Sequence, residues 1–597
     1  MYPLIKSKND SQEQFIGMMD FLRSATPSNW TDITKILRRI KSKTQTSPTL
    51  RINEFIELAA NGTSFYTFGY GIDGVSMEIA KYAQALEGLY QGQRRCTIYL
   101  IGGRFSRQVD SLMKPGWIRH KIEGIQGWAR WDQGKWFQAL FYEDMPKRSK
   151  KSALLVKEIF SQAVRIAESL GKYLLENNIR LLIPVNVASN PGNMASSLAL
   201  VLVSEGLGLY VINSNHDFYW EGGKPKSKRK PGGRIGSRDH FFRNSINKPF
   251  FKVFETLYPW DGDRWIQVNI NKQQSRKLVR HYGFSKKKVF EVSTSVSDEF
   301  FDGYTGSDVK LARIRMAYIL SGGEAILHPI PVEEHIADLK NWMVNQTPCF
   351  LGHRAGLSVN PRSDDLIWLL QPTRIIPRKR IEKDLELIGT LLAERSFQEY
   401  LSQNTNRKII LHITGPTPRD HRVSLKQLLK KFDSLTKSLP APTADRIFLA
   451  FSVGREDHPS LRQNNLQPLS IEEIYRMATL VLFPSSREGR GLPIIESCAS
   501  GVPIICRRYR PVKVFDEVIG KGLSEEQQIH YTPFPEEDYD PEIIEEIVNL
   551  LIHPQSFHDR KRHNKDAVRR RYSREALTKS FESFFEYFCT SKGYSKH

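Results

Sequence analysis

Residues 483–503 read FPSSREGRGLPIIESCASGVP, and this stretch decides the fold of the chain. The apolar run 480–483 before the glycine loop is typical of a buried strand, and the residues from Leu492 onward are typical of a helix. A strand, a glycine loop, a helix and a further strand at 503–506 form a βαβ unit with parallel strands. Backbone N–H groups at the start of such a helix lack partners within it, so the loop is suited to bind a phosphate or a sugar hydroxyl.

Two carboxylates belong to this stretch. Glu488 lies in the loop at the carboxyl end of the strand, which is the side where open α/β sheets bind ligands. Glu496 follows in the helix, so the two are expected to address different parts of one ligand, for example the vicinal hydroxyls of a sugar and a ribose. The alternative interpretation is an ordinary βα turn with surface glutamates.

Strand and helix patterns alternate on both sides of this stretch. They run from residue 366 to residue 506 and, in an earlier series, from residue 64 to residue 292. We therefore predict an α/β protein with two facing, doubly wound, Rossmann-like domains and a cleft between them. The predicted boundaries are a helical extension at 1–60, a first domain at 61–304, a linker or insertion at 305–364, a second domain at 365–567 and a C-terminal helix at 568–597 that packs back on the first domain.

Three further segments carry candidate binding residues. In QPTRIIPRKRIE, residues 371–382, Arg374 and Lys379 follow a strand and are suited to clamp a diphosphate. Residues 69–74, GYGIDG, match the spacing of a dinucleotide-binding loop, but the next strand ends in LIGGR without the acidic residue that an NAD site requires. In NSNHDFYWE, residues 213–221, His216 follows a strand; a lone histidine is more often structural.

These motifs together resemble the retaining glycosyltransferases of family 4, in which two glutamates eight positions apart flank a glycine loop. The resemblance implies a GT-B fold and transfer of a sugar, glucose or mannose, from a nucleotide-diphosphate sugar to a hydroxyl of a small soluble sugar or polyol, or of a lipid-linked acceptor. It assigns catalytic roles to His216, Glu488, Arg374 and Lys379. It also implies a donor site formed by Gly71, Gly74, Arg374, Lys379, Gly415, Glu488, Gly489, Gly491, Leu492 and Glu496, with Asp217 and Glu221 on the acceptor side.

Neither a cofactor nor a metal is expected, because no DxD-type motif sits at a suitable strand end. A phosphorylase would need a pyridoxal lysine motif, which the sequence does not show. The chain departs from the family pattern at Arg490, where an aromatic residue is common, and at residues 293–298.

The charge of the chain supports a second hypothesis. Lys and Arg outnumber Asp and Glu by 87 to 65 among 597 residues, a net charge of +22, and residues 222–238 form a basic, glycine-rich loop. A basic surface attracts polyanions, so a catalytically inactive GT-B protein bound to anionic membrane or nucleic acid is the alternative. No zinc-finger, RRM or homeodomain pattern indicates specific nucleic-acid binding. Five scattered cysteines and a polar start predict a cytoplasmic protein, with peripheral contact at the inner face of the membrane as an option.

Overall fold

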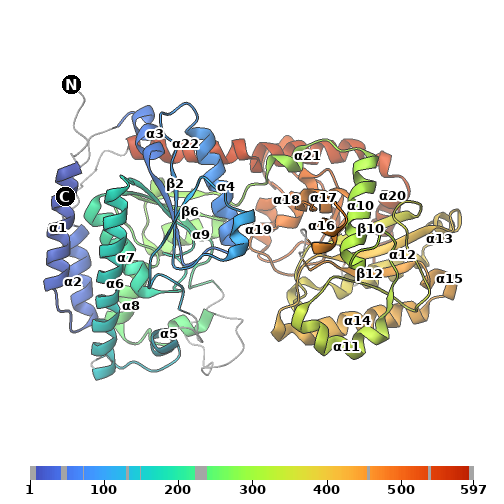
Figure 1. Ribbon diagram of the computed structural model, residues 1–597, viewed down its shortest axis with the longest axis horizontal. Helices are drawn as coiled ribbons and strands as arrows, with labels where there is room; N and C mark the ends of the chain where they lie inside the picture. Colours follow the sequence, from blue (N-terminus) through green and yellow to red (C-terminus); the bar gives the residue numbers. More distant parts are fainter. Residues whose placement is uncertain are drawn as a thin grey trace. The chain divides into compact units, whose positions relative to one another are not determined.

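The computed structural model of the chain describes residues 8–41, 50–71, 73–128, 134–147, 149–221, 238–453, 458–535 and 539–590. The chain divides into two compact units, one of Met1–Thr294 with Leu577–His597 and one of Ser295–Ala576 (Figure 1). The basic loop predicted at 222–238 lies outside the described residues except for Arg238. Among the described residues, no helix is both long enough and apolar enough to cross a membrane.

The first unit is built on a sheet of seven parallel strands in the order β3-β2-β1-β4-β5-β6-β7. The order changes direction between β1 and β4, which makes this pair the topological switch point of the sheet. The strands are β1 (Thr63–Thr67), β2 (Ile98–Gly102), β3 (Ile118–Lys121), β4 (Leu181–Pro184), β5 (Tyr210–Asn215), β6 (Trp265–Asn269) and β7 (Val289–Glu291).

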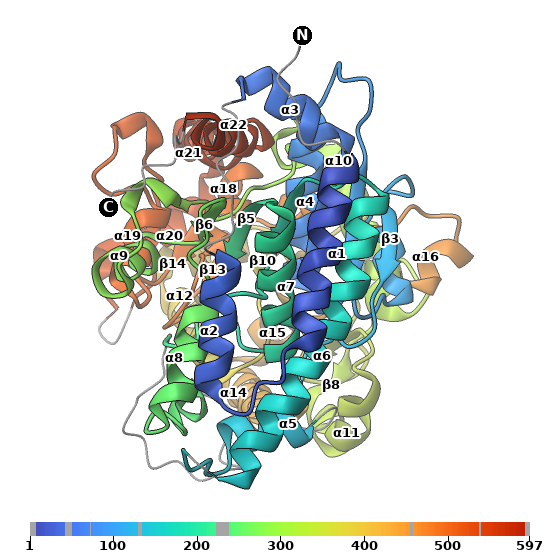
Figure 2. The same cartoon turned by 90° about the vertical axis from the view of Figure 1, so that its left-hand side faces the viewer.

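Successive side chains of each buried strand point to opposite faces of this sheet, so both faces are apolar. Helices cover both of them. Tyr66 of β1 belongs to the core under α1, α2, α6, α7 and α8, whereas Phe65 belongs to the core under α3, α4 and α22. Figure 2 shows α1 and α2 in front of the other helices on this face of the sheet. The helices are α1 (Lys8–Ser24), α2 (Trp30–Lys41), α3 (Ile52–Asn61), α4 (Gly74–Leu89), α5 (Gly134–Phe141), α6 (Lys150–Glu176), α7 (Met194–Leu207), α8 (Lys248–Leu257), α9 (Lys272–Tyr282) and α22 (Arg574–Thr590).

The second unit has an eight-stranded sheet in the order β15-β14-β13-β10-β11-β12-β9-β8. Its strands pair in parallel except that β9 runs antiparallel to β12. The switch point lies between β10 and β13, which pair through Leu369 and Leu480. The strands are β8 (Ile330–Pro331), β9 (Cys349–Gly352), β10 (Asp365–Gln371), β11 (Arg407–Ile413), β12 (Ile447–Phe451), β13 (Leu480–Phe483), β14 (Ile504–Cys506) and β15 (Thr532–Pro533).

Two hydrophobic cores again separate the faces of this sheet. Trp368 packs in one core with residues of α10, α17, α18 and α21, and Leu369 in the other with residues of α11, α12, α13, α14 and α20. The helices are α10 (Gly306–Ser321), α11 (Val332–Asn345), α12 (Glu382–Ala393), α13 (Arg395–Ser402), α14 (Arg422–Ser438), α15 (Ala441–Ala444), α16 (Pro459–Gln463), α17 (Ile471–Arg476), α18 (Leu492–Ala499), α19 (Val512–Val518), α20 (Pro541–Ile552) and α21 (His558–Tyr572).

The prediction of an α/β protein with two Rossmann-like, doubly wound sheets is confirmed. Residues 305–364, however, do not form the predicted linker: they contribute α10, α11, β8 and β9 to the second unit, which begins at Ser295. The sequence signal was weak there because β8 has two residues and β9 four. The C-terminal helix predicted at 568–597 is broken at Ser573, whose backbone is extended, and α22 then packs Phe581 and Phe585 in the core of the first unit.

Candidate functional site

The strongest group of candidate residues lies at the switch point of the second sheet. There the chain leaves β10 and β13 toward opposite sides, so the loops after these neighbouring strands diverge at their carboxyl ends, the position at which open α/β sheets bind ligands. The loop after β10 carries Lys379, and the loop after β13 carries Glu488. The fold therefore brings together two residues that are 109 positions apart in the sequence.

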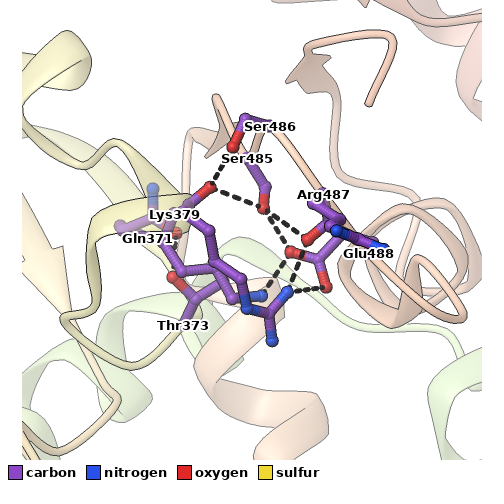
Figure 3. A network of polar contacts seen from close by, with 8 residues as sticks. Gln371, Thr373, Lys379, Ser485, Ser486, Arg487 and Glu488 are labelled. Carbon is purple, nitrogen blue, oxygen red and sulfur yellow. Dashed lines mark hydrogen bonds and ion pairs between the residues drawn. The ribbon is translucent and has the colours of Figure 1, made fainter. Parts of the chain in front are cut away.

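An ion pair joins the two loops (Figure 3). The Lys379 Nζ donates to Glu488 Oε1 at 2.5 Å, and only 10% of each side chain is exposed. The Arg378 guanidinium lies 3.3 Å from Glu488 Oε2, and the Ser485 hydroxyl donates to Glu488 Oε1. The carboxylate thus faces two cations and one hydroxyl, which fixes its orientation.

Burial changes the chemistry of Lys379. Its ammonium lies 5.4 Å from the centre of the Phe483 ring, and burial lowers the pKa of Lys379 even though the Glu488 carboxylate acts in the opposite direction. The nearby charges of Arg378 and Arg374 also lower this pKa. A partly desolvated cation interacts more strongly with an anion than an exposed one does.

Backbone hydrogen bonds hold the Glu488 loop in place. The Ser486 N–H donates to the Arg378 carbonyl at 2.8 Å, and the Glu488 N–H donates to the Arg510 carbonyl at 3.0 Å. The Arg510 N–H returns a bond of 2.9 Å to the Ser486 carbonyl. The loop is tied on one side to the segment after β10 and on the other to the segment after β14, so Glu488 is positioned before any ligand binds.

At two of the predicted glycines the surrounding structure requires a residue without a side chain. A Cβ at Gly415 would lie 2.4 Å from the backbone of Thr373 and Arg374, so only glycine lets the loops after β10 and β11 approach this closely. Gly491 precedes α18 with φ of +66°, and a Cβ there would meet the Tyr509 hydroxyl at 2.3 Å. Gly489, by contrast, has open space around its Cα.

The remaining predicted residues of this unit lie close by in the chain. Glu496 is half-buried in α18 and accepts a hydrogen bond of 2.7 Å from the Tyr475 hydroxyl. Leu492 is the first residue of α18. Arg374 is exposed, so its guanidinium is available to an anion.

Sequence reasoning missed several residues that support this site. Arg378 and Ser485 contact Glu488, yet nothing in the run PRKR shows which cation faces the site. In addition, the Gln371 amide nitrogen donates a hydrogen bond of 2.7 Å to the buried carboxyl of Asp384. The Gln371 amide oxygen accepts a hydrogen bond of 3.0 Å from the Thr373 hydroxyl. Burial raises the pKa of Asp384 well above its usual range, and this network anchors the start of the loop after β10.

The glycine loop of the first unit is held by its own polar groups. The Gly71 N–H donates to the Ser76 hydroxyl at 3.1 Å, and Gly74 is the first residue of α4, which Asp73 caps. Tyr70 stacks on Phe105 with ring centres 4.7 Å apart. A Cβ at Gly71 or Gly74 would meet no close atom, so neither glycine is required by packing within this unit.

The residues predicted after β5 form a connected turn. His216 is buried, and its carbonyl accepts a bond from the Gln274 amide at 3.1 Å. The Asp217 N–H donates to Asn186 at 3.0 Å, and its carboxylate pairs with Arg238 at 3.1 Å. Glu221 accepts bonds from the Phe218 N–H at 2.7 Å and from Gln274, so its carboxylate closes the turn.

One group of described side chains lies close enough to ligate an ion: Glu525, His530 and His563. The imidazoles of His530 and His563 are stacked, with centres 4.3 Å apart and planes inclined by 14°. A ligated ion lies about 2 Å from a ring nitrogen and near the plane of that ring, so two stacked rings do not face a common ion. The group is distinct from the predicted donor site, for which no metal ligand was predicted.

A family model matches part of the second unit. Residues 463–565 match the family described as glycosyl transferases group 1, and Glu488 and Glu496 lie within the matched segment. The mannosylglucosylglycerate synthase of Petrotoga mobilis (strain DSM 10674 / SJ95) is 22% identical over 507 residues, which are 81% of this chain and 92% of that protein.

Two solved structures are also similar to this chain. A glycosyltransferase from Rickettsia africae ESF-5 has a TM-score of 0.47 at 11% identity, covering 89% of this chain and 99% of that one. Alr3699/HepE of Anabaena, in complex with UDP and glucose, has a TM-score of 0.45 at 9% identity, covering 87% of this chain and 97% of that one.

Proposed function

We propose that this chain is a retaining glycosyltransferase that moves a hexose, glucose or mannose, from a nucleotide-diphosphate sugar to an acceptor hydroxyl. The observation that carries the proposal is the Lys379–Glu488 pair at the switch point of the second sheet. It joins a cation suited to a diphosphate with a carboxylate suited to sugar hydroxyls. The group 1 match over residues 463–565 supports the same reaction class.

The proposed roles follow from the chemistry of each group. Lys379 and Arg374 stabilise the diphosphate as it leaves, together with backbone N–H groups near Gly489 and Gly491. A bound diphosphate competes with Glu488 for the Lys379 ammonium, which leaves the carboxylate to accept a hydroxyl of the donor sugar. Glu496 accepts from the ribose.

In the overall reaction the bond from the anomeric carbon to the diphosphate breaks. A bond from that carbon to the acceptor oxygen forms, and the acceptor hydroxyl loses its proton. Retention of configuration rests on the resemblance to family 4. None of these steps assigns a role to a metal.

We place the acceptor in the class of small soluble sugars and polyols. The name of the Petrotoga relative describes a product that contains two sugars and glycerate, which supports a soluble acceptor over a lipid-linked one. On the acceptor side we propose Asp217 and Glu221 from the turn after β5, with a catalytic role for His216 of the same turn. For Gly71 and Gly74 of the loop after β1 we propose donor binding.

Donor binding and turnover test the proposal. A panel of nucleotide sugars is screened by thermal shift, and release of the nucleotide diphosphate is then measured for wild type, Glu488→Gln and the exposed control Glu399→Gln. We expect one donor to raise the melting temperature, and Glu488→Gln to lose about 100-fold or more in turnover while the control keeps it.

Failure of every donor to bind or to be turned over would contradict the proposal that the chain is a glycosyltransferase. Salt-dependent binding to vesicles of anionic lipid, without any turnover, would instead support the non-catalytic alternative.

A further inference from the structure

A cavity of about 420 Å³ opens in the first unit, and none of its lining residues has been assigned a role above. Its walls are α2, from the N-terminal extension, α8, and the segments around Trp260 and Phe284. Figure 2 shows α2 next to α8. Trp30 of α2 packs edge-on against Phe250 of α8 with ring centres 5.1 Å apart, so the two helices that form the walls are fixed by the hydrophobic core.

Three cations line this cavity: Arg38 and Lys41 on α2 and Lys252 on α8. The Lys41 ammonium donates to the Asp261 carbonyl at 2.5 Å and lies 5.6 Å from the centre of the Trp260 ring. Arg38 and Lys252 are exposed, and within the described ranges neither forms an ion pair. Their charges are therefore available to an anion.

Two acidic residues also line the cavity, and both have partners. Asp261 Oδ1 lies 3.3 Å from the Lys288 ammonium. Glu255 Oε1 accepts the Tyr219 hydroxyl at 3.4 Å, and burial raises the pKa of this carboxyl. The unbalanced charge at the mouth of the cavity is therefore positive.

The rest of the lining includes three aromatic rings, those of Trp260, Tyr282 and Phe284, beside Pro259 and Leu37. Thr34 and Thr256 complete it, and their hydroxyls donate to backbone carbonyls of their own helices. Rings of this kind stack on the face of a sugar or a base. Cations together with flat apolar walls are suited to a phosphate carried on a ring, and the volume is in the range that holds a small molecule.

The cavity is connected to the turn after β5. Tyr219 of that turn donates to Glu255 and shares a hydrogen bond of 3.1 Å with the Tyr282 hydroxyl. Trp220 stacks on Tyr282 with ring centres 4.6 Å apart. Two residues of the cavity wall therefore hold the segment that follows His216 and Asp217.

We propose that this cavity binds the phosphate monoester of a sugar or a nucleoside through Arg38, Lys41 and Lys252, and that its occupancy alters the turn 216–221. The site is separate from the donor site of the second unit. Its binding test needs no turnover, so it stands or falls independently of the proposed function.

Calorimetric titration of the full chain tests the binding. The probes are glucose 6-phosphate and adenosine 5′-monophosphate, with glucose and inorganic phosphate as reference ligands. The variants are Arg38→Gln/Lys252→Gln and the control Lys35→Gln/Lys157→Gln, which removes the same charge from exposed positions of α2 and α6 outside the cavity.

We expect saturable binding of one monoester, weakened at least about tenfold in Arg38→Gln/Lys252→Gln and changed by less than about twofold in the control. Because the substituted side chains are exposed, the melting temperature should stay the same. The better of the two monoesters identifies the source as a sugar or a nucleoside.

Three results would overturn the proposal. The first is that neither monoester binds. The second is that the cavity and control variants bind the monoester equally well, and the third is that inorganic phosphate binds as tightly as the better monoester. Hydrogen exchange of residues 216–221 tests the coupling: exchange should change on addition of the ligand in wild type and not in Arg38→Gln/Lys252→Gln. Binding without such a change would refute the link to the turn.

Discussion

The two sheets share a parallel, doubly wound topology, but their switch points are filled differently. Between β10 and β13 the loops carry a lysine and a glutamate that pair at 2.5 Å. Between β1 and β4 the loops instead pack the Phe68 ring against Gly192, where a Cβ would lie 2.6 Å from that ring. One switch point holds opposite charges, and the other holds an aromatic ring packed on a glycine.

This difference indicates which unit binds the donor and which binds the acceptor. Charged groups at a switch point suit a ligand with a diphosphate, which the second unit would bind. The first unit offers amides, a histidine and a half-exposed Asp217–Arg238 pair after β5, which suit neutral hydroxyls. We therefore expect substitutions in the second unit to affect the donor, and substitutions in the turn 216–221 to affect the acceptor.

The largest effect is expected from Lys379→Met. This variant removes the buried cation and leaves Glu488 with Arg378 and the Ser485 hydroxyl, so turnover should fall by about 100- to 1,000-fold. The measurement is steady-state release of the nucleotide diphosphate. Lys383→Met is the matched control, because its partner Glu386 keeps Lys431; equal losses in the two variants would remove the distinction between the switch point and the rest of the unit.

Gly415→Ala should have the next largest effect. The added Cβ meets the backbone of Thr373 and Arg374 at 2.4 Å, so the loop after β10 must shift, at a cost of about 1–3 kcal/mol in the free energy of unfolding. We expect the donor KM to rise about tenfold. Gly306→Ala, where the Cβ has open space, is the control; unchanged donor KM and stability in Gly415→Ala would refute the close approach.

The pH dependence gives a smaller and more specific effect. Burial lowers the pKa of Lys379, so the ammonium loses its proton, and with it its affinity for the diphosphate, as the pH rises through a value below the ordinary lysine value of about 10.4. Donor affinity should therefore be full at lower pH and fall on the alkaline side. Lys379→Arg should move this fall to higher pH; identical alkaline profiles would show that another group titrates.

Asp217→Asn is expected to have the smallest effect, and on a different parameter. The variant breaks a half-exposed ion pair, which contributes about 0–1 kcal/mol, and keeps a side chain able to form hydrogen bonds. The acceptor KM should rise by about threefold while the donor KM stays the same. A change in the donor KM alone would contradict the assignment of the turn 216–221 to the acceptor.

Much of the fold was predictable because it depends on local patterns. The strands β1 and β13 and the helix α18 follow from apolar runs and glycine loops, and these patterns also locate Glu488 and Glu496. The segment 305–364 was not predictable in the same way, since β8 and β9 are too short to show a period. Their pairing beside β12 depends on contacts far apart in the sequence.

The candidate site was predictable as a set of residues, and less so as a set of contacts. Lys379 and Glu488 were identified separately, but their direct pairing follows from the neighbouring positions of β10 and β13. The choice of Arg378 as a second partner depends on the turn Pro377–Lys379, from which the Arg378 and Lys379 side chains both reach the Glu488 carboxylate. Sequence spacing does not specify these directions.

We expect a nucleotide-diphosphate sugar to bind in the loops after β10 and β13. Hydrogen exchange of the full chain, with and without the donor that raises the melting temperature, tests this binding site. Residues 372–380 and 484–496 should be protected in wild type, and this protection should be lost in Lys379→Met. Protection confined to other segments, or equal protection of these loops in Lys379→Met, would contradict it.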